Sequence, residues 1–344
     1  MRKTTIEDIA REAGVSAQTV SRVINNRPDV ALETRRRVQE IIKQRNYKPN
    51  AIAQGLRAQR TGMIGLIIET PDKYGPSAKF IELDKHAHQE GYRLLPILVH
   101  EGEPRDISGF LADLLSHQPD GIIWGVTEFD GDRERFGDLI LNAPVPIVTM
   151  SSTIPGVPKP AAIDQFETSR KLTNHLIEQG YRNIGIITGP GRELQAIERF
   201  DGWKEALLNA SLPANDEQVC AGDWSSASGK DCMARLYNTF PQIDALFASN
   251  DQMALGAMNF AQGQGLRVPD DLGVVAFDDI PEAAYFKPGL TTARQPFQDF
   301  CRITVQSLVA MINTDGDDDA VPPQETTMLY SEIIVRDSSM RSSA

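Results

Sequence analysis

The chain has 344 residues, of which 41% are hydrophobic and 24% charged, and its formal net charge is −12. These values are ordinary for a folded protein of two or three domains and exclude a disordered or fibrous chain. The N-terminus lacks the apolar core of a signal peptide, and no apolar run approaches the roughly 18 residues of a membrane span. We therefore expect a cytoplasmic protein. Cys220, Cys232 and Cys301 are widely spaced and distant from histidines, so we expect reduced thiols without a metal or redox role.

The charge is unevenly distributed along the chain. Residues 1–60 contain 13 Lys and Arg against 6 Asp and Glu, a net charge of +7, which leaves −19 on the remainder. A basic N-terminal segment is typical of a nucleic-acid-binding domain. The acidic remainder would repel DNA from every other surface of the protein.

Three short helices are expected in residues 1–46. Thr5 and Asp8 have the spacing of a capping box, and the first apolar stripe ends at Gly14, a residue suited to the left-handed position after a helix. Ser16 is placed to cap a second helix, and a third is expected over roughly residues 32–44. The apolar faces of the three helices consist of Ile6, Ile9, Ala10, Ala13, Val20, Val23, Ile24, Val38, Ile41 and Ile42. The tight turn between the first two helices predicts a helix-turn-helix.

The second helix carries the candidate base-reading residues. Gln18 can pair bidentately with adenine and Arg22 with guanine, while Ala17 offers an apolar contact. These residues cluster in the N-terminal half of the helix, the part that enters the major groove. The whole candidate DNA-contacting set in this segment is Thr5, Ser16, Ala17, Gln18, Thr19, Ser21, Arg22, Asn25 and Thr34. A small helical domain with a solvated basic face is the alternative.

Residues 47–61 are expected to form a linker with a hinge helix near residues 50–58. Such a short helix is marginal in water, and Gly55 costs it roughly 1 kcal/mol relative to alanine. Leu56 is suited to wedging between base steps in the minor groove, with Arg57 on a phosphate. Asn50 and Ala53 complete the candidate contacts of this segment. The alternative is a flexible tether in which Leu56 packs on a partner chain.

The runs TIEDIAREAGVSAQTVSRVIN and TRRRVQEIIKQRNYKPNAIAQGLR resemble the DNA-binding headpiece and hinge of the lactose-repressor (LacI/GalR) family of bacterial transcription regulators. By this resemblance, Ala17, Gln18 and Arg22 match base-reading positions and Leu56 matches the minor-groove wedge. The resemblance also implies a homodimer bound to a pseudo-palindromic operator in double-stranded DNA at the bacterial nucleoid.

Beyond residue 62, short apolar runs alternate with helical patterns, which is typical of parallel sheets with crossover helices. The first set of strands is expected at residues 63–68, 94–99, 121–124 and 146–150, with helices near 77–90, 106–117 and 132–142. A second set is expected at 162–163, 184–187, 245–248 and 273–277. The fold class is therefore a small all-α helix-turn-helix domain plus an α/β body of two doubly wound parallel-sheet subdomains, periplasmic-binding-protein-like. We expect an N-terminal subdomain of residues 62–161 and 290–324 and a C-terminal subdomain of residues 162–289 and 325–340.

A ligand site is expected between the two subdomains, at the carboxyl ends of the strands. Acids and amides that bridge neighbouring hydroxyls, with aromatic walls, suit a sugar or glycoside. The candidate effector-binding residues are Glu69, Ser151, Asp164, Gln195, Arg199, Trp224, Asn250, Asp278, Gln295 and Phe297. Asn and Asp after a strand are also common helix caps. Asp279 is interpreted as a cap, and Asp251 fits either role.

The family resemblance is also dense in this part, for example in SNDQMALGAM, FDD and LTTARQ. It implies polar effector contacts from Arg199, Asn250, Asp278 and Gln295 and aromatic walls from Trp224 and Phe297. The sequence departs from the lactose repressor itself at four positions. Glu69 stands where that repressor has serine, and Lys79 where it has an apolar residue. Gly125 stands in place of an asparagine and Ser151 in place of an aspartate. They argue against a simple galactoside and favour a larger or differently configured sugar.

Two other function classes are less well supported. An enzyme acting on sugars or nucleotides would need a phosphate-binding glycine motif or a catalytic triad. Neither glycine motif occurs in the sequence, and the five histidines are expected away from the strand ends, where a triad would lie. A transport-type binding protein would lack the basic N-terminal segment. The run Asp315 to Asp319 is interpreted as a solvated acidic turn rather than a metal loop. No apolar heptads follow Ser338, so we expect a dimer without a tetramerising coiled coil, and no cofactor.

Overall fold

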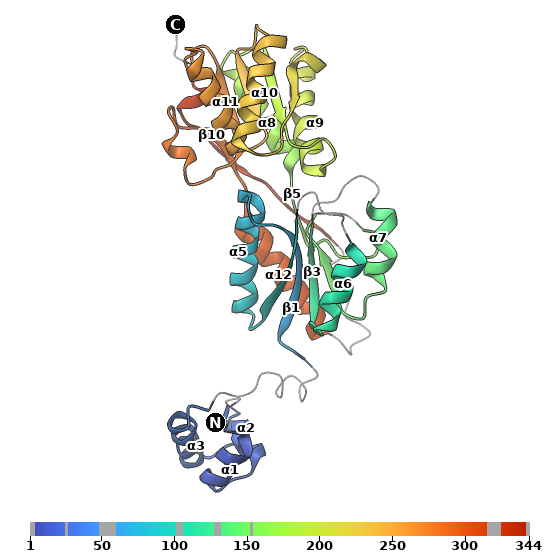
Figure 1. Cartoon of the computed structure of the whole chain (residues 1–344), viewed down its shortest axis with the longest axis vertical. Coiled ribbons are helices and arrows are strands. Elements are labelled where there is room, and N and C mark those ends of the chain that lie inside the picture. Colours follow the sequence, from blue (N-terminus) through green and yellow to red (C-terminus); the bar gives the residue numbers. More distant parts are fainter. Residues whose placement is uncertain are drawn as a thin grey trace. The chain divides into compact units, whose positions relative to one another are not determined.

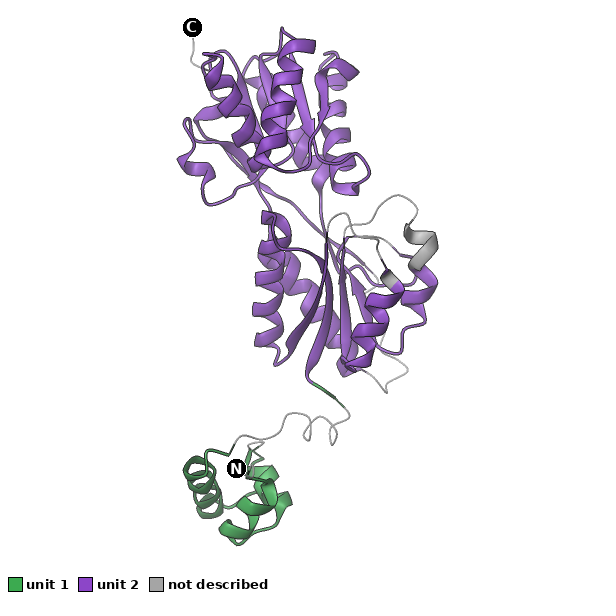
Figure 2. Ribbon diagram, in the orientation of Figure 1, with its two compact units in different colours: residues 1–61 green, residues 62–344 purple. Residues whose placement is uncertain are grey.

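The computed structural model describes residues 4–24, 27–47, 60–100, 106–126, 132–151, 154–314 and 325–341. The chain divides into two compact units, the head of residues 1–61 and the body of residues 62–344 (Figure 2). No helix in these described ranges is long and apolar enough to cross a membrane. The expected acidic turn at residues 315–319 lies outside the described residues.

The head contains α1 (Ile6–Ala13), α2 (Ala17–Ile24) and α3 (Leu32–Gln44). Thr5 forms the expected capping box: its Oγ1 accepts from Asp8 N at 3.3 Å, and Asp8 Oδ2 accepts from Thr5 N at 3.0 Å. Gly14 follows α1 in the left-handed region, at φ 65°. The core of the head consists of Ile9, Ala10, Ala13, Val20, Val23, Val38 and Ile41, with Ile6, Ile24 and Ile42 packed at its border.

The first half of the body is a four-stranded parallel sheet in the order β2-β1-β3-β4. Its strands are β1 (Met63–Glu69), β2 (Arg93–Val99), β3 (Gly121–Gly125) and β4 (Ile147–Thr149). Helices α5 (Tyr74–Gln89) and α12 (Phe297–Asn313) pack together on one face, and α6 (Ile107–Ser116) and α7 (Asp132–Leu141) accompany the other (Figure 1). Because both faces are covered, β1 and β3 are apolar along nearly their whole length.

The second half is a six-stranded sheet in the order β12-β10-β9-β8-β6-β7. Its strands are β6 (Ile184–Thr188), β7 (Val219–Ala221), β8 (Ala245–Ala248), β9 (Gly273–Asp278), β10 (Thr291–Arg294) and β12 (Glu332–Ile334). Helices α8 (Gln165–Glu178) and α9 (Leu194–Asn209) pack as one pair, and α10 (Ser226–Thr239) and α11 (Asp251–Gly263) as another (Figure 1). Short 3₁₀ helices lie at Asp216–Gln218, Ala283–Tyr285 and Asp337–Ser339.

The structure corrects two details of this topology. Strand β10 pairs with β9, so the chain leaves the second sheet after Arg294 rather than at residue 290. A strand as short as TTAR has no pattern that selects a sheet, and the open edge of β9 decides its place. Strand β12 is antiparallel to β10, so the second sheet is not wholly parallel. The link strands β5 (Ala161–Ile163) and β11 (Thr327–Leu329) form a separate parallel pair.

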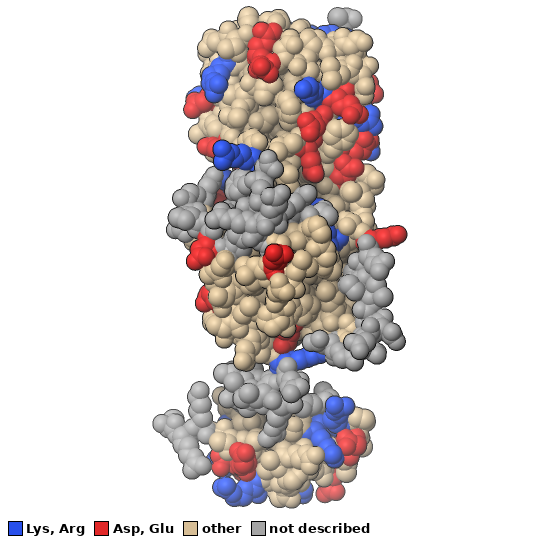
Figure 3. Space-filling model, turned by 90° about the vertical axis from the view of Figure 1, so that its right-hand side faces the viewer, with Lys and Arg blue, Asp and Glu red and all other residues tan. Residues whose placement is uncertain are grey.

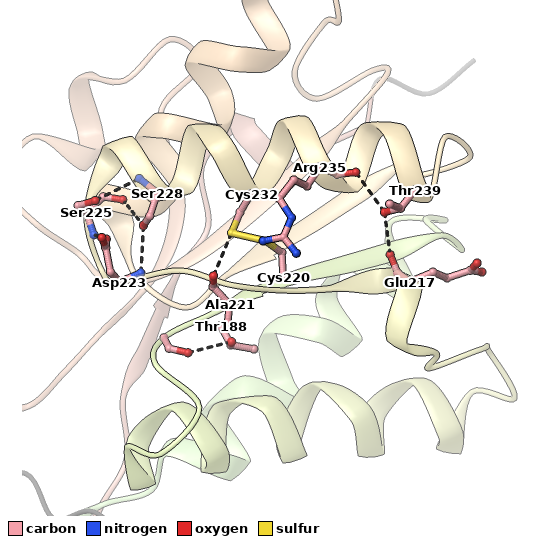
Figure 4. The surroundings of a disulfide bond; sticks show 11 residues. Thr188, Glu217, Cys220, Ala221, Asp223, Ser225, Ser228, Cys232, Arg235 and Thr239 are labelled. Atoms are coloured by element: carbon pink, nitrogen blue, oxygen red, sulfur yellow. Dashed lines mark hydrogen bonds between the residues drawn. A yellow bond between two sulfur atoms is a disulfide. The ribbon is translucent and has the colours of Figure 1, made fainter.

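Cys220 on β7 and Cys232 on α10 form a disulfide, with their Cα atoms 5.6 Å apart (Figure 4). The expectation of reduced thiols is therefore wrong for this pair. The packing of α10 on β7 brings the two residues within the usual Cα separation of a disulfide, which the 12-residue spacing did not reveal. Cys301 is a free thiol in the core, and burial raises its pKa to about 12.

The left-handed conformation of Gly14 generates a prediction about the head. Gly14→Ala places a Cβ in a conformation that costs an L-residue about 1–2 kcal/mol, although no atom lies within 4 Å of the added carbon. Hydrogen exchange of the α1 and α2 amides in the full chain should be faster by the factor that corresponds to this loss of folding free energy. Gly14→Asn should recover part of the loss, because asparagine tolerates this conformation.

The matched control is Gly263→Ala at the end of α11, where the backbone is helical and the added Cβ also meets no atom. This change should leave exchange in the head unaltered and should stabilise α11 slightly. Equal exchange rates for Gly14→Ala and the unmodified head would contradict the assigned backbone strain.

Candidate nucleic-acid interface and ligand cavity

The surface of the head that includes α2 is the candidate nucleic-acid interface. Gln18 and Arg22 are exposed there, and Ala17, Ser21 and Thr34 are half-buried. Arg22 Nη1 lies 3.3 Å from Asp29 Oδ2, in an ion pair whose two side chains are each about half exposed. Such an exposed pair contributes little free energy, so the guanidinium remains available to another acceptor.

Three residues predicted to contact DNA have a second function within the head. Ser16 Oγ accepts from Thr19 N at 3.1 Å and lies 3.0 Å from Thr19 Oγ1, which caps α2 as expected. Thr5 caps α1 in the same manner. Figure 3 shows both basic and acidic side chains on one face of the head. The other predicted DNA contacts, Asn25, Asn50, Ala53, Leu56 and Arg57, lie outside the described residues.

A cavity of about 470 Å³ lies within the body, lined by residues of both sheets and their helices. The structure places all ten candidate effector residues on its wall: Glu69, Ser151, Asp164, Gln195, Arg199, Trp224, Asn250, Asp278, Gln295 and Phe297. The volume is within the usual range of small-molecule sites. No group of three or more His, Cys, Asp or Glu side chains in the described ranges is arranged to hold a metal ion.

A continuous chain of hydrogen bonds crosses the second-sheet wall of this cavity. Arg199 Nε donates to Gln165 Oε1 at 2.9 Å, Gln165 Nε2 donates to Gln295 Oε1 at 3.1 Å, and Gln295 Nε2 donates to Asp278 Oδ1 at 2.7 Å. The four side chains come from α9, α8, β9 and the link between β10 and α12. The chain fixes the orientation of both amides, so each of these polar groups has one defined direction toward a ligand.

Arg199 is buried and lies between aromatic rings. Its guanidinium carbon is 3.9 Å from the ring centroid of Phe277 and 5.6 Å from that of Trp224, and Nη1 donates to the carbonyl of Ser249. Burial lowers the pKa of Arg199, an effect opposed by the carboxylate of Asp278. Burial likewise raises the pKa of Asp278, and the charge of Arg199 opposes that shift. Each charge therefore offsets part of the desolvation cost of the other.

The aromatic wall depends on a glycine beneath it. Trp224 lies over Gly189, where a Cβ would be 2.0 Å from the indole Cζ2, and its Nε1 donates to Glu193 Oε2 at 3.0 Å. Tyr74 and Phe297 form an aromatic pair elsewhere on the wall, with ring centroids 6.4 Å apart. The cavity therefore combines hydrogen-bonding groups with apolar ring faces.

Several candidate residues also have structural partners. Asp164 caps α8 by accepting from Glu167 N at 2.7 Å, and Asn250 caps α11 by accepting from Met253 N at 2.9 Å. Ser151 Oγ donates to the carbonyl of Val126 at 2.7 Å. Their roles as ligand contacts remain predictions.

Asp251 and Asp279 do not line the cavity. Asp251 is buried and accepts from Thr292 Oγ1 at 2.6 Å and from Ile280 N at 2.8 Å, which assigns it a structural role. Asp279 does not act as the expected helix cap. Its carboxylate accepts from Arg294 Nε at 2.8 Å and from Arg336 Nη2 at 2.7 Å, because the end of β10 and the segment after β12 bring the two arginines to it.

Part of the cavity wall consists of residues that the sequence patterns did not indicate. His100 directly follows β2 and lines the cavity, so the expectation that the histidines lie away from strand ends is wrong for this residue. Other residues not singled out are Tyr74, Lys159, Gln165, Glu193 and Glu198. Gln165 could have been found from its place after Asp164 at a strand end. Lys159 lies in an irregular segment, where no periodic pattern indicates the direction of a side chain.

Comparison with known proteins agrees with this architecture. Residues 5–50 match the family of bacterial regulatory proteins, lacI family, and residues 173–339 match a periplasmic binding protein-like domain. The chain is 33% identical to the HTH-type transcriptional repressor PurR of Haemophilus influenzae, over 97% of this chain and 98% of that protein. It is 32% identical to the catabolite control protein A of Priestia megaterium, over 92% and 95% of the two chains.

Two solved structures are also similar over 98% of this chain and the whole of their own. One is the lac repressor dimer bound to operator and an anti-inducer, at 27% identity and a TM-score of 0.87. The other is the transcriptional regulator CelR in complex with cellobiose, at 28% identity and a TM-score of 0.70. The head with its exposed α2, the body with its cavity and the full-length likeness to these regulators together show that the chain belongs to the lacI family of bacterial regulatory proteins.

Proposed function

We propose that the chain is a DNA-binding transcriptional repressor that acts as a dimer in the cytoplasm, with α2 reading a pseudo-palindromic operator. The observation that carries the DNA-binding half is the exposure of Gln18 and Arg22 on one helix whose opposite face forms the core of the head. These two side chain types supply the bidentate contacts that distinguish adenine and guanine in the major groove. The lac repressor dimer on its operator supports the same arrangement.

The ligand half of the proposal is that a sugar in the body cavity controls operator affinity. A sugar presents hydroxyl groups around an apolar ring face. In the cavity, Asp278, Gln295 and Arg199 can bind the hydroxyl groups, and Trp224 can pack on the ring face. The likeness to CelR bound to cellobiose supports this ligand class. A planar purine base is the competing class, since Tyr74 and Trp224 offer rings on which it would stack.

The ligand would act by a population shift. It can change operator affinity only through a difference between its affinities for the DNA-bound and the released state of the dimer. The test is operator binding, followed by fluorescence anisotropy, during titration with mono- and disaccharides and with purine bases. A sugar that releases the operator or tightens operator binding supports the proposal. A response to purine bases alone would show that the controlling ligand is a purine base and not a sugar.

Arg22→Ala should relax sequence preference at one base pair of each operator half-site by about 1–3 kcal/mol. The operator is first selected from randomised duplexes, and affinities are then measured for duplexes changed at single positions. Arg11→Ala is the matched control, because Arg11 is an exposed arginine on α1 that pairs with Asp8 at 3.5 Å. Equal weakening on all duplexes by Arg22→Ala would make this residue a phosphate contact and contradict base reading.

Arg199→Met should abolish the ligand response and leave basal operator binding intact. The variant keeps an unbranched side chain between Phe277 and Trp224 but removes the charge-assisted hydrogen bonds, each of about 1.5–3 kcal/mol. Ligand affinity, measured calorimetrically with the active sugar, should fall by at least tenfold. Arg302→Met, on a half-exposed arginine of α12 paired with Asp299 at 2.8 Å, is the control and should respond as the parent does.

A further inference from the structure

The charged residues of the cavity are divided unevenly between its two walls. The wall from residues 62–160 carries Lys73, Lys79 and Lys159 against Glu69 and Asp72. The wall from residue 161 onward carries Asp164, Glu193, Glu198 and Asp278 against Arg199 alone. The first wall is therefore net cationic and the second net acidic among the described residues. A ligand with hydroxyl donors at one end and negative charge at the other matches this polarity.

Lys79 is one of the three described lysines on the first wall. It lies on α5, is half-buried and lines the cavity. Lys159 Nζ, by contrast, donates to the carbonyl of Ser151 at 3.0 Å. Within the described ranges, no hydrogen bond or ion pair holds Lys79 Nζ.

The same helix provides a comparison. Lys85 is half-exposed on α5, and its Nζ donates to both oxygens of Glu82, at 3.0 and 3.3 Å. Thus one lysine of α5 has an acidic partner next to it on the helix, whereas the lysine that lines the cavity has none among the described residues. An ammonium group partly removed from water binds an anion more strongly than an exposed one.

Three of the four acids of the second wall already have other partners. Asp278 accepts from Gln295 and faces Arg199, Asp164 caps α8, and Glu193 accepts from Trp224. Lys79 is close enough for its charge to lower the pKa of Asp278, although no ion pair joins the two. The remaining acceptor capacity of these carboxylates suits hydroxyl groups.

We propose that the controlling ligand is a sugar bearing an anionic group, a carboxylate or a phosphate, and that Lys79 binds this group while the hydroxyls face the acidic second wall. This inference rests on the proposed function, because it names the class of sugar that enters the same cavity. It makes Lys79 a specificity-determining residue. The lysine selects the charge of the ligand, and the hydrogen-bonded wall selects its configuration.

The experiment uses the full chain and isothermal titration calorimetry at fixed ionic strength. The probes are matched sets of glucose, galactose and mannose, each as the neutral sugar, the uronic acid and the 6-phosphate, together with cellobiose and inorganic phosphate. For the configuration that binds, the acid or the phosphate should bind at least tenfold tighter than the neutral sugar, about 1.4 kcal/mol. The two anionic arms distinguish a carboxylate from a phosphate ligand.

Substitutions assign the preference to Lys79. Lys79→Gln should reduce the preference to within about twofold by weakening the anionic member alone, because only that member carries the charge that the ammonium attracts. Lys79→Arg should retain it. Lys85→Gln, the matched control on α5, should leave every affinity unchanged.

Three results would overturn the proposal: a neutral sugar that binds as tightly as its acid and phosphate, equal weakening of neutral and anionic sugars by Lys79→Gln, or no binding of any probe. The second result would indicate that Lys79 does not select the charge of the ligand. Release of operator by a neutral sugar would refute the anionic ligand and keep the proposed function. Loss of all ligand control over operator binding would refute the proposed function itself.

Discussion

The buried guanidinium of Arg199 is the interaction on which the arrangement of the cavity depends. A lone buried cation would be strongly unfavourable, and this one is accommodated by two aromatic ring faces, the carbonyl of Ser249 and the amide of Gln165. These contacts fix Gln165, which fixes Gln295, which in turn holds Asp278. The orientation of four side chains from separate elements therefore follows from one charge. Replacement of Arg199 or Asp278, the two ends of this series of hydrogen bonds, would leave buried polar groups unsatisfied.

Much of the fold could be predicted from the sequence, because its strands are buried on both faces and its helices carry regular apolar stripes. The capping box at Thr5, the left-handed Gly14 and the span of α3 were all legible from local residue chemistry. What could not be predicted depends on packing between distant segments. The place of β10, the Cys220–Cys232 bond and the two ion pairs of Asp279 each require knowing which surfaces meet.

The cavity residues likewise divide into those that could be predicted from the sequence and those that could not. Residues after strands, such as Asp164, Asn250 and Asp278, were found because carboxyl ends of parallel strands converge. Lys159 and Glu198 were not found, since one lies in an irregular link and the other on a helix without a distinguishing pattern. In the head, Ser16 and Thr19 combine capping of α2 with a predicted contact to DNA. The same hydroxyl groups that define where α2 begins would thus also mark its end nearest the DNA backbone.

The link that carries Gln295 has unequal freedom on its two sides. Arg294, just before it, is held by Asp279 and Glu332, and Pro296, just after it, has a fixed φ torsion and leads directly into α12. The link of Tyr330 and Ser331 contains no proline. A rotation of one sheet relative to the other should therefore change the backbone torsions of Tyr330 and Ser331 more than those around Gln295. A ligand that binds Gln295 would then contact a residue that keeps its place while the sheets rotate.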